Sequence, residues 1–129
     1  MNRSQIINVL GNKTHDNCHI LGTVNVPLEK LADYVRQFSK EAEIVVYSTS
    51  SHDYTTYEAA KLLKALGYTS VYAYLGGVAD WHNQGLPTTG ICSTELMAHV
   101  PSKNIVYEHP KGIEFISAEE LSQRMDILL

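Results

Sequence analysis

Short apolar runs and amphipathic stretches alternate along the first 90 residues of the chain. The runs at Ile6–Leu10, Ile44–Tyr47 and Val71–Leu75 are rich in β-branched residues, which is typical of strands buried in a parallel sheet. Residues 28–39 and 59–66 repeat apolar side chains at spacings of three and four, which predicts helices. Strands that alternate with helices indicate an α/β domain with a mainly parallel sheet.

A polar loop, residues 48–54, follows the run at Ile44–Tyr47. Thr55 and Glu58 then match a capping box, in which each side chain accepts a hydrogen bond from the other residue's backbone N–H, so a helix is expected to start there. In an open α/β sheet, ligands bind at the carboxyl ends of the strands, and a helix N-terminus favours an anion. We therefore predict a binding loop, with Tyr57 beside it, made of Ser48, Thr49, Ser50, Ser51, His52, Asp53 and Tyr54.

Composition narrows the range of partners. The net charge is −4 with no basic stripe, so nucleic acid is not an expected partner. No apolar run approaches the roughly 18 residues that cross a bilayer, and no secretory signal begins the chain. We therefore expect a cytoplasmic protein without a membrane partner. Neither a cofactor nor a metal is predicted.

The two cysteines, Cys18 and Cys92, leave alternatives open. They could form one disulfide, but they show no disulfide framework and no metal-ligand spacing. Cys18 could also be a nucleophile or a redox thiol, although a structural or inert role is favoured because it lies on a different loop from the helix end. His15 and His19 have the spacing of a helical metal-binding pair, but their segment does not have a helical pattern.

Four segments carry a more specific signal. They are the strand Ile7–Leu10, the segment Cys18–Pro27, the strand Ile44–Ser48 with the following helix to Tyr68, and Gly76–Trp81 with Gly85–Pro87. Together they resemble the rhodanese-like family of sulfurtransferase domains over about residues 6–89. The resemblance implies a five-stranded, mainly parallel sheet with helices on both faces, and sulfurtransferase ancestry.

The family's chemistry, as the resemblance implies it, depends on a cysteine at the end of the central strand, which holds a sulfur atom as a persulfide. Ser48 stands at that position, and a serine hydroxyl cannot form a persulfide. The loop arginine that would hold an anionic donor is also missing, and Asp53 would repel an anion. We therefore expect a degenerate active site, in a non-catalytic binding or regulatory module that binds a small anion or a protein at the loop. The alternative is a sulfurtransferase whose native cysteine was replaced by Ser48, or which uses another thiol.

Ser48, His52 and Asp53 also have the residue types of a hydrolase triad. Residues so close together in one tight loop rarely reach the required geometry, so a polar loop that bonds its own backbone is the favoured interpretation.

The family pattern ends near residue 90, which divides the chain into residues 1–90 and a C-terminal extension, residues 91–129. Residues 93–99 predict a short helix, Ile113–Ile116 a strand, and Ser117–Leu128 a helix opened by a capping box. This strand and helix resemble the opening of a rhodanese-like domain, which the N-terminal part lacks. We expect residues 113–128 to complete the same domain, in a monomer or in a tail-swapped homodimer.

Overall fold

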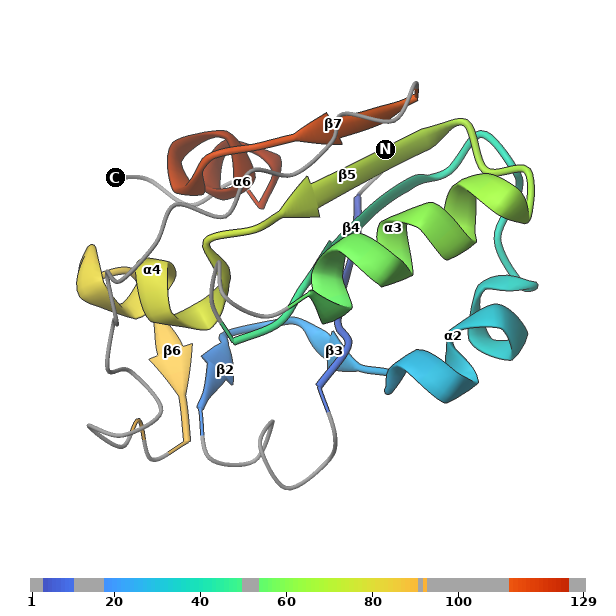
Figure 1. Cartoon of the computed structure of the whole chain (residues 1–129). Helices are drawn as coiled ribbons and strands as arrows, with labels where there is room; N and C mark the ends of the chain where they lie inside the picture. Colours follow the sequence, from blue (N-terminus) through green and yellow to red (C-terminus); the bar gives the residue numbers. More distant parts are fainter. Residues whose placement is uncertain (1–3, 11–17, 50–53, 91, 93–111, 126–129) are drawn as a thin grey trace.

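The computed structural model describes residues 4–10, 18–49, 54–90, 92 and 112–125, and within them it contains a five-stranded sheet (Figure 1). All pairings in this sheet are parallel, which confirms the predicted α/β fold class. In spatial order the strands are β3 (Val24–Asn25), β1 (Gln5–Asn8), β4 (Glu43–Tyr47), β5 (Ser70–Tyr74) and β7 (Ile113–Phe115).

A second, two-stranded sheet was not predicted. It pairs β2 (His19–Ile20) with β6 (Thr88–Thr89) in antiparallel register, with His19 opposite Thr89. Strands of two residues carry no readable periodicity, so only the chain's long-range path brings these segments together.

Four helices in the described residues cover both faces of the main sheet, as the resemblance implied (Figure 1). They are α2 (Leu28–Val35), α3 (Thr55–Ala65), α4 (Gly77–Asn83) and α6 (Ala118–Arg124). Alternate residues of β4 point to opposite faces. Val46 therefore joins a core with Leu31 of α2 and Leu63 of α3. Val45 joins a second core with residues of α4 and α6.

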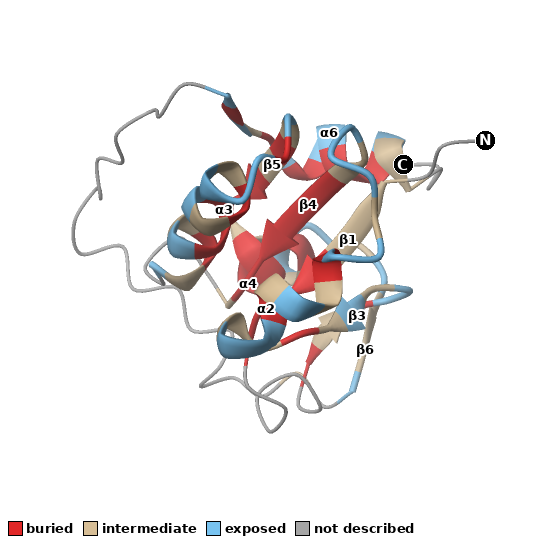
Figure 2. Cartoon of the chain, turned by 90° about the vertical axis from the view of Figure 1, so that its right-hand side faces the viewer, coloured by how far each residue is buried: buried red, intermediate tan, exposed pale blue. Residues whose placement is uncertain are grey.

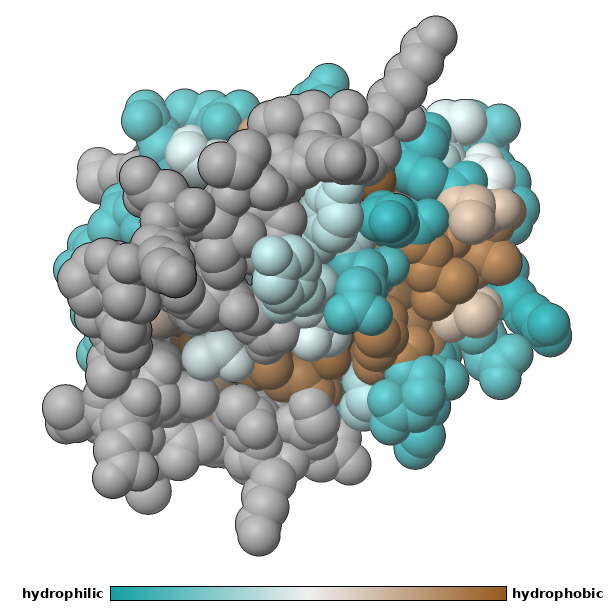
Figure 3. Space-filling model, viewed as in Figure 1, coloured by the Kyte–Doolittle hydropathy of each residue, from teal (hydrophilic) through white to brown (hydrophobic). Residues whose placement is uncertain are grey.

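The central strand is the most deeply buried part of the sheet (Figure 2). Its residues Ile44 to Tyr47 all have no solvent exposure. Outside this core, Figure 3 shows an apolar strip over the region of α2 and α3, bordered by hydrophilic side chains. Phe38, which follows α2, and Leu62 of α3 are partly buried against the core, and Leu66, the C-cap of α3, is exposed. No helix among the described residues has the length and apolar character needed to span a bilayer.

The C-terminal strand and helix pack on the body of the protein. Strand β7 lies parallel to β5 at the sheet edge, with Ile113 opposite Val71. Helix α6 buries Leu121 completely. At the end of α6, Arg124 Nη1 lies 2.6 Å from Glu43 Oε1 of β4, and its guanidinium carbon stacks 3.9 Å from the centre of the Tyr72 ring. The predicted helix at residues 93–99 and the rest of the connection from 93 to 111 lie outside the described residues.

Of the two predicted capping boxes, one forms and one does not. Ser117 has an extended backbone, so its side chain accepts a bond from the Glu120 N–H and the Glu120 side chain accepts one from Ser117 N–H. The box predicted at Thr55 is wrong, because Thr55 is already the first residue of α3. The N-cap is Tyr54, whose backbone is helical and which forms no side-chain cap bond.

The docking of α6 can be tested with one core variant. Leu121→Ala should reduce the free energy of unfolding by about 2–5 kcal/mol, because it leaves a cavity in a fully buried site. Gln123→Ala, an exposed position on the same helix, is the matched control and should change stability little. The measurement is urea unfolding followed by circular dichroism. Equal stability of the two variants would mean that α6 does not pack on the core.

Candidate functional site

The candidate site begins where β4 ends. Ser48 and Thr49 follow Tyr47 directly, at the carboxyl end of the central strand, and Tyr54 precedes α3. The structure thus places these three predicted residues between the central strand and a helix N-terminus, as expected. Ser50, Ser51, His52 and Asp53 lie outside the described residues.

The Ser48 side chain is inside the protein. It has no solvent exposure, and its Oγ lies 2.7 Å from Thr56 Oγ1, on the first turn of α3. Thr56 is also fully buried. Hydroxyl groups buried in this way are satisfied by each other, because leaving either without a partner would cost desolvation energy.

The backbone of the site is bonded to α4. The Ser48 carbonyl accepts a bond from the Val78 N–H at 3.0 Å, and the Thr49 carbonyl accepts one from the Ala79 N–H at 2.8 Å. Two N–H groups in the first turn of α4 are therefore used by the loop itself. Gly77 permits this contact, because it has a φ of +69° and a Cβ added there would lie 2.6 Å from the Ser48 carbonyl oxygen. Gly76-Gly77 therefore allows α4 to lie directly against the site.

The two tyrosines predicted to line the loop have different surroundings. Tyr54 is 53% exposed. The Tyr57 ring instead meets Phe115 of β7 edge to face, with 6.3 Å between ring centres. Of these two tyrosines, Tyr54 is the one that presents a large part of its side chain to solvent.

A buried polar network anchors the residue before Ser48. The Thr23 hydroxyl donates to the Ile20 carbonyl at 2.8 Å, so the Tyr47 hydroxyl donates to Thr23 Oγ1 at 2.7 Å and accepts from the Ile20 N–H at 3.1 Å. Burial raises the pKa of Tyr47 above its usual value, although these hydrogen bonds oppose the shift. The network joins the end of β4 to β2.

Asn8 lies at the carboxyl end of β1, in the same layer as Tyr47. It is fully buried, and its Oδ1 accepts a bond from the Leu10 N–H at 2.8 Å. Its Nδ2 has no hydrogen-bond partner among the residues that the structure describes. From the sequence, Asn8 was predicted only as part of a strand.

Comparison with known proteins agrees with this geometry. The family model for the rhodanese-like domain matches residues 1–84, well over half of the chain.

The chain belongs to the rhodanese-like domain family.

Relatives of this rhodanese-like domain include a thiosulfate sulfurtransferase, GlpE, from Shewanella oneidensis, which is 31% identical over 78 residues, or 60% of this chain and 75% of GlpE. Among solved structures, a rhodanese-like domain from Anabaena sp. has 31% identity and a TM-score of 0.60, over 66% of this chain and 97% of that one. A rhodanese with anions from E. coli, at 21% identity and a TM-score of 0.55, covers 67% of this chain and 98% of its own, and shows the fold alone.

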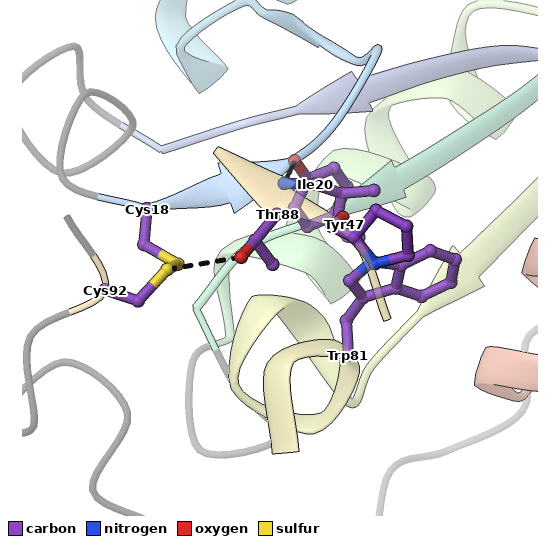
Figure 4. Close-up of a disulfide and its surroundings, with 7 residues drawn as sticks. Cys18, Ile20, Tyr47, Trp81, Thr88 and Cys92 are labelled. Carbon is purple, nitrogen blue, oxygen red and sulfur yellow. Dashed lines mark hydrogen bonds between the residues drawn. A yellow bond between two sulfur atoms is a disulfide. The ribbon is translucent and has the colours of Figure 1, made fainter. Parts of the chain in front are cut away.

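A second cluster shares no residue with the loop at Ser48, and its three-residue arrangement was not predicted. Cys18 and Cys92 form a disulfide, one of the alternatives that the sequence left open (Figure 4). His82 of α4 lies beside it, and the ligand atoms of the three residues lie within 4.8 Å of one another. Disulfides are typical of oxidising compartments, so this bond argues against the expected cytoplasmic location, which stays a prediction.

The rhodanese-like domain also has a surface pocket of about 290 Å³ between the start of β5 and that of β7. Its lining includes Ser70, Tyr72 and Glu114. In a parallel sheet this is the opposite end from Ser48, so the pocket is not part of the candidate site.

The two buried tyrosines predict a loss of stability at alkaline pH. Burial raises the pKa of Tyr74. The Asp80 carboxylate raises it further, because its Oδ2 accepts a hydrogen bond from the Tyr74 hydroxyl, with 2.5 Å between the two oxygens. Tyr47 and Tyr74 thus keep their protons in the folded protein above the ordinary tyrosine pKa of 10.0, where the unfolded chain loses them. The raised pKa values of the two tyrosines therefore contribute fully to folding stability below pH 10, and this contribution is lost as the pH rises beyond it.

Each tyrosine should contribute up to about 1.4 kcal/mol of destabilisation per pH unit above that point. Urea unfolding at a series of pH values on both sides of pH 10 measures the slope, and Tyr74→Phe should make it shallower. An identical slope in Tyr74→Phe and the wild type would contradict the assignment for Tyr74.

Proposed function

We propose that this rhodanese-like domain is a non-catalytic binding or regulatory module in which Ser48 occupies the position of the family's cysteine. The observation that carries the proposal is the state of the Ser48 hydroxyl, which is fully buried and bonded to Thr56. A hydroxyl needs a base to become a nucleophile, and Thr56, its described side-chain partner, is not one. A serine oxygen also cannot hold a sulfur atom as a persulfide.

The chain's two thiols do not offer a ready substitute. Cys18 and Cys92 are the chain's only cysteines, and they are bonded to each other in the disulfide. A thiol nucleophile would first require reduction of this bond. The alternative function, sulfur transfer through a persulfide, therefore depends on a native cysteine at position 48 or on prior reduction. The activity named for the relative GlpE is a property of that protein.

For the ligand of the module we propose a small anion or a protein, bound at loop 48–54. The N-cap of α3, Tyr54, forms no side-chain cap bond, and the helix dipole favours negative charge at this end of the helix. Glu58 in the first turn, and Asp53 in the loop, oppose an anion, so its binding should be weak. Tyr54, exposed beside the loop, has the character of an aromatic anchor for a protein partner.

For the assembly we propose a monomer whose own tail supplies β7 and α6 to the domain, as in a circular permutation. The parallel pairing of β7 with β5 supports this arrangement. A tail-swapped homodimer is the alternative. Sedimentation equilibrium distinguishes them, because only the swapped form has twice the 14.4 kDa chain mass.

The wild-type protein should show no thiosulfate:cyanide sulfurtransferase activity, because no thiol stands at position 48. Ser48→Cys should restore little activity, because Asp53 still disfavours an anionic donor. Thr49→Cys, which places a thiol one residue further along the chain, is the matched control for any activity that a thiol near this position produces. The measurement is thiocyanate formation under non-reducing conditions.

Steady wild-type turnover that survives loss of both Cys18 and Cys92 would contradict the proposed function. Full activity of Ser48→Cys alone would favour the alternative, in which a native cysteine was replaced.

Sulfate binding can be followed by amide chemical shifts. Sulfate in the millimolar range should shift the amide signals at the start of α3, because the helix dipole attracts an anion to that end. Amides at the other end of α3, near Lys64, serve as the internal control. Shifts that are equal at both ends, or absent, would mean that the loop has no anion site.

A further inference from the structure

Three side chains that can bind a metal converge from three separate segments of the chain. Cys18 precedes β2, His82 lies in α4, and Cys92 follows β6. The two sulfur atoms and the His82 ring nitrogen lie within 4.8 Å of one another. In Figure 4 the two cysteines meet at the disulfide, and the Thr88 side chain points toward it.

The surrounding fold holds these segments together without the disulfide. The pairing of β2 with β6 places His19, next to Cys18, opposite Thr89. Trp81, next to His82, donates its indole N–H to the Pro87 carbonyl at 2.8 Å and so fixes the end of α4 against the start of β6. The Leu21 N–H donates to the same carbonyl at 3.2 Å. The three ligands are therefore brought together by contacts that do not involve the sulfur–sulfur bond.

We propose that reduction of the disulfide creates a zinc site made of Cys18, Cys92 and His82. Two thiolates and an imidazole are ligands that Zn²⁺ prefers, and three protein ligands with a water molecule complete its tetrahedral coordination. A dithiol reductant supplies two electrons and two protons to the disulfide and becomes a disulfide itself. Zn²⁺ then displaces the two thiol protons.

The local charge also favours the metal in the reduced state. Cys18 is fully buried, and a buried thiolate without a counter-charge is costly. One Zn²⁺ neutralises both thiolates, while His82 binds as a neutral imidazole. Thr88 Oγ1 lies 3.5 Å from Cys92 Sγ, and since a disulfide sulfur has no proton, the hydroxyl is the donor. The same hydroxyl can donate to a zinc-bound thiolate, as outer groups at zinc sites commonly do.

Zinc and the disulfide compete for the same two sulfur atoms, so the site is controlled by redox state. In a reducing compartment the chain binds Zn²⁺, and oxidation releases the ion as the disulfide forms. This inference does not depend on the proposed function of loop 48–54, because no residue is shared between the two sites.

The test compares reduced and oxidised full-length protein under anaerobic conditions. Reductant is removed, and Zn²⁺ affinity is measured by competition with a colorimetric chelator. Reduced wild-type protein should bind one Zn²⁺ per chain, and the oxidised protein should bind none. With Co²⁺ in place of Zn²⁺, the reduced protein should show thiolate-to-cobalt charge-transfer absorption and the intense visible bands of a tetrahedral ion.

Two variants test the ligand assignment. His82→Ala should lower the affinity of the reduced protein by more than about tenfold, because loss of a ligand costs at least as much as loss of an outer-shell partner. Asn83→Ala, an exposed neighbour on the same helix, is the matched control and should bind as the wild type does.

Reduced wild-type protein that binds Zn²⁺ no better than the oxidised form would overturn the proposal. So would equal affinities of His82→Ala and Asn83→Ala. Both comparisons use chains with both cysteines intact, so they do not depend on whether a cysteine variant folds.

Discussion

The burial of β4 on both faces of the sheet is the constraint that fixes the rest of the structure. Val46 and Val45 point into opposite cores, one closed by α2 and α3 and the other by α4 and α6. A strand without solvent contact must have every polar group satisfied by the protein. At the carboxyl end of the strand this is achieved by α4, whose N–H groups donate to the Ser48 and Thr49 carbonyls, and by Thr56 of α3, which is bonded to the Ser48 hydroxyl.

Position 48 shows how this constraint affects function. The Ser48 carbonyl is bonded to α4 and its hydroxyl to α3, so one residue joins two helices from opposite faces of the sheet. Gly77 removes the side chain that would keep α4 away. In our account, the serine at this point of the rhodanese-like domain contributes hydrogen bonds and no sulfur chemistry. We propose that the loop that follows serves for binding.

The fold was predictable where the signal is local. The β-branched runs gave β4 and β5 to within one residue, and the box at Ser117 opened a helix as expected. The same capping-box pattern at Thr55 gave a wrong prediction, because the backbone of Tyr54, the residue before it, is already helical. The position of Ser48 was predictable from the order of strand and helix, but its burial was not. The Cys18–Cys92 disulfide was only one of the alternatives that the sequence left open, and the position of His82 beside it was missed. Both depend on long-range pairing of strands that are too short to recognise in the sequence.

The central claim is that position 48 is closed to solvent, and thiol reactivity tests it most directly. With the native cysteines in their disulfide, Ser48→Cys introduces the one free thiol of the chain, and Ser39→Cys places a thiol at an exposed control position. The rate of alkylation by iodoacetamide is measured for both folded variants. Our account predicts that the thiol at position 48 reacts far more slowly and reaches the control rate only on unfolding. Equal or faster reaction at position 48 in the folded protein would show an open, reactive site and would contradict the account.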